Sequence, residues 1–237
     1  MASVRDFGAV GDGQADDTEA IRHAVEAGDG TLHFDRGTYR LSGTVEVPLA
    51  EHGRLSIRGD GTARVVMGVA GPAFRVIGTH GGTADPGSLT DSVSDVERMP
   101  TVSGLEILGD HDGAVGIELT GTMQATLHGV LIRRCHIGMH LTKRNRNVLI
   151  DACHIYDGRG STAVGVYFDG VNLHQAIIVG SHISYHRHAG IKIARSEIRN
   201  LQITGNDIEY HHDDQDGNPD SADVWIDSRE GTVREGT

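Results

Sequence analysis

The 237-residue chain is poor in aromatic residues, proline and basic residues. Aromatic residues make up 4% of it, and the formal net charge is −12. It lacks an apolar run long enough to span a bilayer, so we expect no membrane association. The acidic balance argues against nucleic acid as a partner, because phosphate binding needs a basic surface. Neither a charged nor an apolar leader precedes Val4, so we expect no signal peptide.

Glycine, in contrast, is abundant, and in the second half it opens a repeated Gly-apolar-x-apolar frame. The frame recurs at Gly116–Leu119, Gly138–Leu141, Gly165–Phe168 and Gly190–Ile193, and returns as Asp223–Ile226. Spacings of 22, 27, 25 and 33 residues suit a solenoid with insertions at its turns. The runs are short, rich in Ile and Val, and alternate with period two, so they predict strands.

A second motif, Ile-x-x-Cys/Ser/Asn-x-Ile, recurs with the same repeat as the first and begins at Ile132, Ile150, Ile178 and Ile203. Two or three strands per coil close into one turn of a parallel β-helix. The motif predicts one interior column of Cys135, Cys153, Ser181 and Asn206, with free thiols favoured over a disulfide. It also predicts an outward column of His136, His154, His182 and Asp207. Ordinary stacking is favoured there over a metal site.

The first half differs from the repeats. Asp16, followed by Glu19, indicates an N-terminal capping arrangement for a short amphipathic helix that ends at Gly28. Strands follow at residues 30–34 and 37–41, and another begins at Val45. A solenoid needs its open end covered, and this helix is placed to do so.

The segment from Val4 to Leu41 contains the motifs DFGAVGDG, DDTEAI, GTLHF and GTYRL. In these motifs the chain resembles the pectate lyase-like superfamily, the group near polygalacturonases, rhamnogalacturonases and mannuronan epimerases. The resemblance implies an all-β, right-handed parallel β-helix and an extracellular or periplasmic location. The same signature occurs in tailspike-type polysaccharide binders, so it implies a fold more than a reaction.

The catalytic motifs of that superfamily match poorly. Of the polygalacturonase motifs, the chain offers Asp213-Asp214 and the segment Ile191–Ile193 without a preceding Arg. Of the epimerase motif Tyr-Gly-x-Asp-Pro-His it has only Asp85-Pro86, in a predicted turn. Neither scheme transfers residue by residue.

The repeat itself predicts a candidate site. Apolar residues of each frame point inward, so two columns point outward. The first is Glu118, His140, Tyr167, Lys192 and Trp225, and the second is Thr120, Thr142, Asp169, Ala194 and Asp227. Their rungs lie about 4.8 Å apart. The superfamily resemblance implies a substrate groove on this sheet. A solvated polar face is the equally weighted alternative.

Cationic residues follow the same strands. Lys143, Arg144, Arg146 and Arg195 are candidates for binding a polyanion such as a uronate polymer. For β-elimination, Lys192 is the candidate base, with Tyr167 or His140 as the acid. For hydrolysis the candidates are Asp169 and Asp227, two rungs or about 10 Å apart.

Two insertions interrupt the coils, near residues 78–100 and 211–221. In the second, Asp214, Asp216 and Asn218 imitate part of a Ca²⁺ loop, but Pro219 replaces the required Gly. An EF-hand is excluded, and a looser Ca²⁺ site remains a minor alternative. No other cofactor is indicated.

We therefore predict one β-helix domain over residues 1–237, with the cap and first strands at 1–41 and the coils at 42–237. Nothing in the sequence covers the last coil, so either further coils follow or a second subunit covers it. The predicted function is β-elimination on an acidic polysaccharide. A glycoside hydrolase and a non-catalytic glycan-binding or structural β-helix are the alternatives.

Overall fold

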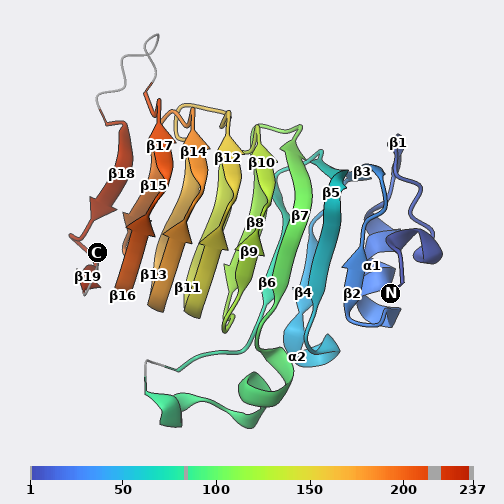
Figure 1. Cartoon of the computed structure of the whole chain (residues 1–237), viewed down its shortest axis with the longest axis horizontal. Coiled ribbons are helices and arrows are strands. Elements are labelled where there is room, and N and C mark those ends of the chain that lie inside the picture. The colour runs from blue at the N-terminus through green and yellow to red at the C-terminus, as the bar shows by residue number, and fades with distance from the viewer. Residues whose placement is uncertain (1, 83–84, 213–219, 235–237) are drawn as a thin grey trace.

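The computed structural model describes residues 2–82, 85–212 and 220–234. The chain winds into a parallel β-helix, in which each strand pairs with its counterpart in the next coil (Figure 1). The coils stack along the long axis of the molecule from the N-terminal to the C-terminal end (Figure 1). The predicted all-β fold and strand direction are therefore confirmed.

Each coil contributes to three sheet faces. Face 1 consists of β4 (Val45–Pro48), β6 (Gly71–Ile77), β8 (Ala114–Thr120), the first parts of β11 (Ile137–Asp151) and β13 (Val164–Val179), β15 (Ala189–Ala194) and β18 (Ala222–Asp227). Face 2 consists of β2 (Thr31–His33), the starts of β5 (Ser56–Met67) and β7 (Thr101–Gly109), β9 (Thr126–His128), the later parts of β11 and β13, β16 (Glu197–Thr204) and β19 (Thr232–Arg234). Face 3 consists of β1 (Asp12–Asp16), β3 (Gly37–Leu41), the ends of β5 and β7, β10 (Leu131–Arg133), β12 (His154–Tyr156), β14 (His182–Ser184) and β17 (Asp207–Glu209).

The N-terminal end of the core is covered by the short helix η1 (Val4–Phe7) and by α1 (Thr18–Ala27), as predicted (Figure 1). Helix α1 buries Ile21, and its last turn is followed by Gly28. The predicted capping arrangement is right in part: the Asp16 carboxylate accepts a hydrogen bond from the Thr18 backbone, whereas Glu19 pairs with Arg22 instead. Asp17 occupies the cap position without a side-chain cap, because its carboxylate accepts hydrogen bonds from the backbone of Val10 and Gly11 instead.

The glycine of the repeated frame is required by the close approach of successive coils. A Cβ atom on Gly138 would lie 2.5 Å from the carbonyl oxygen of Gly165, and one on Gly165 would lie 2.5 Å from that of Gly190. Such distances are too short for any side chain, so the frame fixes the strand register. The register of the two predicted columns is confirmed residue by residue, but Thr120 and Ala194 of the second column are buried.

The second motif was aligned wrongly in one coil. Ile155 pairs with Ile132, so Cys153 follows Val130 in its column rather than Cys135. Ser181 and Asn206 continue that column as predicted, joined by hydrogen bonds from the Cys153 backbone to Ser181 Oγ and from the Ser181 backbone to Asn206 Oδ1.

Both cysteines are buried and free, as predicted. Burial raises the pKa of the Cys135 thiol to about 12 and that of Cys153 to about 11, so both stay protonated. The same alignment error displaces His136, because Leu131 lies opposite His154. The predicted outward histidine column therefore loses His136.

The insertion at residues 78–100 joins face 1 to face 2 and contains η2 (Pro86–Ser88) and the π-helix η3 (Ser92–Glu97). It packs beside the turn of the following coils, where Arg144 donates a hydrogen bond to the Gly82 carbonyl. Helix α2 (Leu49–His52), which the sequence did not predict, lies at the same side of the coils (Figure 1).

At the last described rung of face 1, the inward-facing side chains of Val224 and Ile226 are 38% and 51% exposed. Their counterparts in the preceding coil, Ile191 and Ile193, are buried. Among the described residues, no helix is long and apolar enough to cross a membrane.

Candidate functional site on face 1

The first outward column of face 1 extends further than predicted. It begins with Glu46 and Arg75 on β4 and β6 and continues through the five predicted residues. We call the full column, Glu46, Arg75, Glu118, His140, Tyr167, Lys192 and Trp225, the strip.

The N-terminal half of the strip is held by ion pairs. Arg75 contacts Glu46 and Glu118 at 2.8 Å each. Glu118 also lies 3.5 Å from His140 Nδ1. Hydrogen bonding with His140 and Arg75 lowers the pKa of Glu118 despite burial, so this carboxylate stays ionised. The predicted binding residue Glu118 thus already has its partners within the protein.

His140 connects the two halves of the strip. Its Nε2 lies 3.1 Å from Asp169 Oδ2, and its ring stacks on Tyr167 with centroids 5.6 Å apart. Burial opposes the charged form, but Glu118 and Asp169 outweigh burial and raise the pKa of His140. His140 is therefore suited to donate a proton and unsuited to accept one.

Lys192 occupies the next rung after Tyr167, and its Nζ lies 5.2 Å from the centre of the tyrosine ring. Burial, and then the charge of Arg195, lowers the pKa of Lys192 although Asp169 and Asp227 oppose the shift. Burial raises the pKa of Tyr167, and the charge of Asp169 adds to the effect. Lys192 therefore loses its proton more readily than an ordinary lysine, whereas the neighbouring Tyr167 keeps its proton more firmly than an ordinary tyrosine.

Both aspartates of the second column are paired with arginines. Asp169 contacts Arg195, and Asp227 contacts Arg229. Hydrogen bonds from Arg229 lower the pKa of Asp227 to about 2. A cavity of about 330 Å³ lies here, lined by Ala194, Arg195, Asp227, Arg229 and Glu230. The sequence analysis had not singled out Arg229.

The predicted basic residues do not all reach this cavity. Arg195 lines it, whereas Arg144 is directed to the insertion and bonds Gly82. Arg146 is 8% exposed, so the prediction that it offers a surface contact is wrong. Lys143 is exposed and lies within β11, where the backbone bends with a positive φ. The predicted Ca²⁺ ligands Asp214, Asp216 and Asn218 lie outside the described residues.

Comparisons with known proteins agree with the β-helix fold. A family profile described as right handed beta helix region matches residues 95–231, more than half of the chain. The chain belongs to this right-handed β-helix family. A second profile, described as rhamnogalacturonase A/epimerase, pectate lyase-like, matches residues 1–88. The resemblance stated from the N-terminal motifs is therefore confirmed.

Two enzymes of Azotobacter vinelandii share short stretches with this β-helix. Alginate lyase 7 is 47% identical over 60 residues, which are 24% of this chain and 7% of that enzyme. Mannuronan C5-epimerase AlgE3 is 50% identical over 48 residues, 19% of this chain and 3% of that enzyme. The matches thus span a small part of these relatives.

The Streptococcus pneumoniae surface protein and adhesin PfbA has a similar structure, with a TM-score of 0.52 at 16% identity. The superposition covers 87% of this chain and 66% of PfbA. At this identity the likeness concerns the fold alone.

His188 is a residue of this β-helix site that the sequence analysis missed. Its ring lies 5.2 Å from that of Trp225, and burial together with the charge of Lys192 lowers its pKa. Two residues before each frame glycine the sequence reads Ala114, His136, Ala163 and His188. This alternation was the available signal for a histidine beside the strip.

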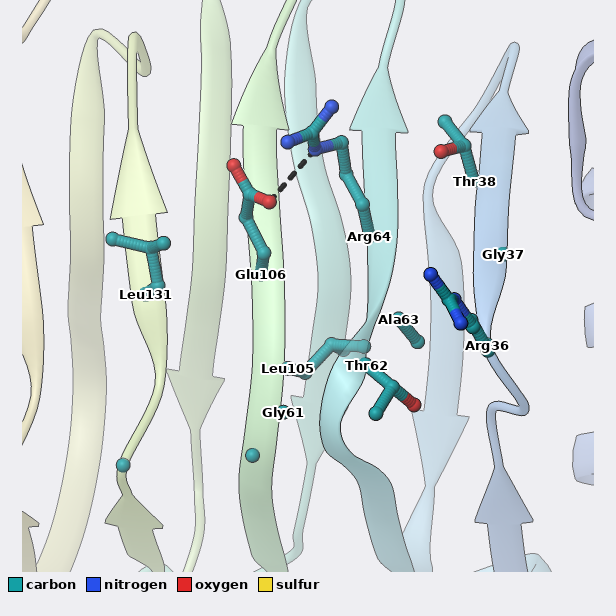
Figure 2. A pocket seen from close by; sticks show the side chains of 12 residues that line it. Arg36, Gly37, Thr38, Gly61, Thr62, Ala63, Arg64, Leu105, Glu106 and Leu131 are labelled. Atoms are coloured by element: carbon teal, nitrogen blue, oxygen red, sulfur yellow. Dashed lines mark hydrogen bonds and ion pairs between the residues drawn. The ribbon is translucent and has the colours of Figure 1, made fainter.

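A second cavity, of about 360 Å³, lies on face 3 (Figure 2). There Arg64 on β5 contacts Glu106 on β7 at 2.7 Å, and Arg36 points between β3 and β5 (Figure 2). Arg133 contacts the other oxygen of Glu106, also at 2.7 Å. Burial raises the pKa of Glu106, but the hydrogen bonds from Arg64 and Arg133 outweigh burial and lower it. This cavity offers no group suited to accept a proton, so face 1 is the better catalytic candidate.

Proposed function

We propose that this β-helix binds an acidic, uronate-containing polysaccharide along the C-terminal half of the strip and cleaves it by β-elimination, with Lys192 as the base. The observation that carries the proposal is the position of Lys192. It lies between two aromatic residues, with a lowered pKa, one rung from a tyrosine whose pKa is raised.

The reaction requires a base for the proton next to the carboxylate of the sugar. Lys192 Nζ takes this proton, and the electrons of the broken C–H bond form a double bond within the ring. The glycosidic bond to the neighbouring carbon breaks, and its oxygen receives a proton from Tyr167 or His140. Arg195 neutralises the substrate carboxylate, which makes the first proton easier to remove.

Substrate binding draws on the same end of the strip. Trp225 supplies an apolar ring face for a sugar, and Arg195 and Arg229 supply cations beside the cavity. Two relatives are named for alginate cleavage and for mannuronan epimerisation. Alginate is therefore the first polymer to test.

Hydrolysis by Asp169 and Asp227 is disfavoured. A glycoside hydrolase needs one carboxylic acid that keeps its proton. The pKa of Asp227 is lowered to about 2, and Asp169 lies between His140 and Arg195. At so low a pKa Asp227 is ionised, and Asp169 is already engaged in an ion pair with Arg195.

The test is the ultraviolet absorbance of unsaturated product when the chain is incubated with alginate, polygalacturonate or rhamnogalacturonan. We expect absorbance to rise with at least one polymer and to remain flat for Lys192→Ala. Arg64→Ala, which removes a cation from face 3, is the matched control and should retain activity.

A flat trace for the unaltered chain with all three polymers would contradict elimination. Nuclear magnetic resonance of the recovered alginate then separates two outcomes. Inverted uronates would indicate that the proton is returned without cleavage. Unchanged polymer that still binds the chain would indicate a non-catalytic glycan-binding protein.

A further inference from the structure

Face 3 carries, near its C-terminal end, three metal-ligating side chains that the proposed function does not use. His182 lies on β14, and Asp207 and Glu209 lie on the neighbouring β17. His182 pairs directly with Asp207, and Glu209 is two residues further along the same strand. One ligand atom from each residue lies within 4.8 Å of the other two.

The carboxylates of this group differ from others on the same face in their charge environment. Glu106 forms an ion pair with Arg64 (Figure 2) and a second one with Arg133. In the described part of the chain, Asp207 and Glu209 have no ion pair with a lysine or arginine. The neighbouring imidazole is that of His182, whose Nε2 is 3.9 Å from Glu209 Oε1. Two carboxylates and an imidazole therefore converge without a fixed counter-charge.

We propose that His182, Asp207 and Glu209 bind a divalent transition-metal ion of the Zn²⁺ type. An imidazole nitrogen with two carboxylate oxygens is a ligand set that Zn²⁺ accepts, whereas Ca²⁺ prefers six to eight oxygens. The parallel pairing of β14 and β17 fixes the spacing of the ligands before the metal arrives. All three side chains are partly or fully exposed, so neighbouring packing does not prevent them from rotating toward an ion.

The preceding rung places a fourth donor nearby, the second nitrogen of the group. His154 on β12 pairs with His182, and their ring centroids are 5.9 Å apart. With three protein ligands, the remaining coordination positions belong to water or to His154. The metal links β14 to β17 and thereby stabilises the C-terminal rung of face 3, because it binds the folded state and not the unfolded chain.

The experiment is isothermal titration of the chelator-treated chain with ZnCl₂, MnCl₂ and CaCl₂ separately, followed by thermal unfolding with and without each ion. We expect one Zn²⁺ site on face 3, weaker Mn²⁺ binding, and an increase in Tm with Zn²⁺. Loss of one ligand in His182→Ala or Glu209→Gln should weaken Zn²⁺ binding at this site by roughly tenfold or more. Co²⁺ provides a second readout, since its visible spectrum reports nitrogen and oxygen coordination and should change in both variants.

His128→Ala is the matched control. His128 Nδ1 lies 2.8 Å from Asp151 on face 2, so it is also an exposed histidine–carboxylate pair, but it lacks the second carboxylate. We expect this variant to keep both Zn²⁺ affinity and the Co²⁺ spectrum. Absence of Zn²⁺ binding, or binding that is unchanged in both His182→Ala and Glu209→Gln, would overturn the proposal. Glu209→Gln preserves the side-chain shape, so it remains informative if His182→Ala fails to fold.

Discussion

The two halves of the strip have the same backbone and different chemistry. In the N-terminal half, Glu46, Arg75 and Glu118 neutralise one another across successive rungs. In the C-terminal half, Lys192 lies between Tyr167 and Trp225, and burial lowers its pKa. In a regular solenoid, equivalent residues of successive coils lie a few ångströms apart. Charges of alternating sign therefore stabilise such a column, whereas like charges would repel. The half that departs from this pattern is the half suited to a ligand.

The largest expected effect comes from removing the base in the C-terminal half. Lys192→Ala should lower kcat/KM for the cleaved polymer by roughly 10²- to 10⁴-fold, the usual range for a general base. Glu46→Gln alters the N-terminal half and should leave kcat/KM nearly unchanged. The measurement is the initial rate of cleavage by both variants. Equal losses of kcat/KM would contradict the functional difference between the two halves of the strip.

A smaller effect, on stability, is expected where the backbone holds the two halves in register. In Gly165→Ala the new Cβ would lie 2.5 Å from the Gly190 carbonyl oxygen, so the coils must separate. We expect a loss of at least about 1–3 kcal/mol in the free energy of unfolding, measured by denaturant titration. Gly81→Ala, whose Cβ would meet nothing closer than 3.9 Å, is the control. Similar stabilities for both variants would show that close packing does not impose the frame.

Trp225→Ala tests whether the C-terminal half binds sugar rings. Loss of one stacking surface should weaken polymer binding by about tenfold, or roughly 1.4 kcal/mol. Tyr185→Ala removes an exposed aromatic ring that stacks on Tyr210 away from the strip, and it should bind normally. The measurement is the Kd for oligouronates by calorimetry. A greater loss in Tyr185→Ala would move the binding surface elsewhere.

The smallest effect near neutral pH is expected from His186 and His211, two buried histidines whose rings stack on each other in the C-terminal coils. Burial, with a contribution from His211, lowers the pKa of His186 to about 3. The unfolded chain takes up a proton at this residue near pH 6.5, about the ordinary histidine value. The stability it contributes is therefore complete above that pH and decreases as the pH falls toward 3.

In His186→Gln the decrease in stability with acid should be shallower, as measured by unfolding at a series of pH values. An identical slope in the variant and the unaltered chain would assign the acid sensitivity to other groups.

The register of face 1 followed from the sequence because the frame glycine is required by backbone contact between coils. The first two rungs of the strip were missed, because Thr44 and Ala73 stand where later coils have glycine. The error at Cys135 arose from two overlapping patterns. Ile132-x-x-Cys135-x-Ile137 fits the motif, whereas Leu127-x-x-Val130-x-Ile132 shares only its apolar spacing, yet the pairing of Ile132 with Ile155 shows that the second is the true repeat.

The candidate site was less predictable than the fold. Periodicity indicated that Lys192 and Tyr167 are adjacent, and the direction of the Lys192 pKa shift agrees with that expectation. It could not indicate that Asp227 pairs with Arg229 or that Arg146 is buried, because turns and insertions determine both. Glu209 was missed because the sequence analysis compared only equivalent positions of successive coils, such as His182 and Asp207. Glu209 lies two residues further along β17.

The most direct test of the central claim uses the fact that the chain has two lysines, Lys143 and Lys192. Isotope-labelled methyl groups on both amines give separate resonances, and Lys192→Arg assigns them. We predict that the Lys192 signal titrates below the ordinary lysine value of about 10.4 and shifts when oligouronate is added. A Lys192 signal that titrates at or above that value and does not respond to oligouronate would contradict both its role as base and the position of the binding strip.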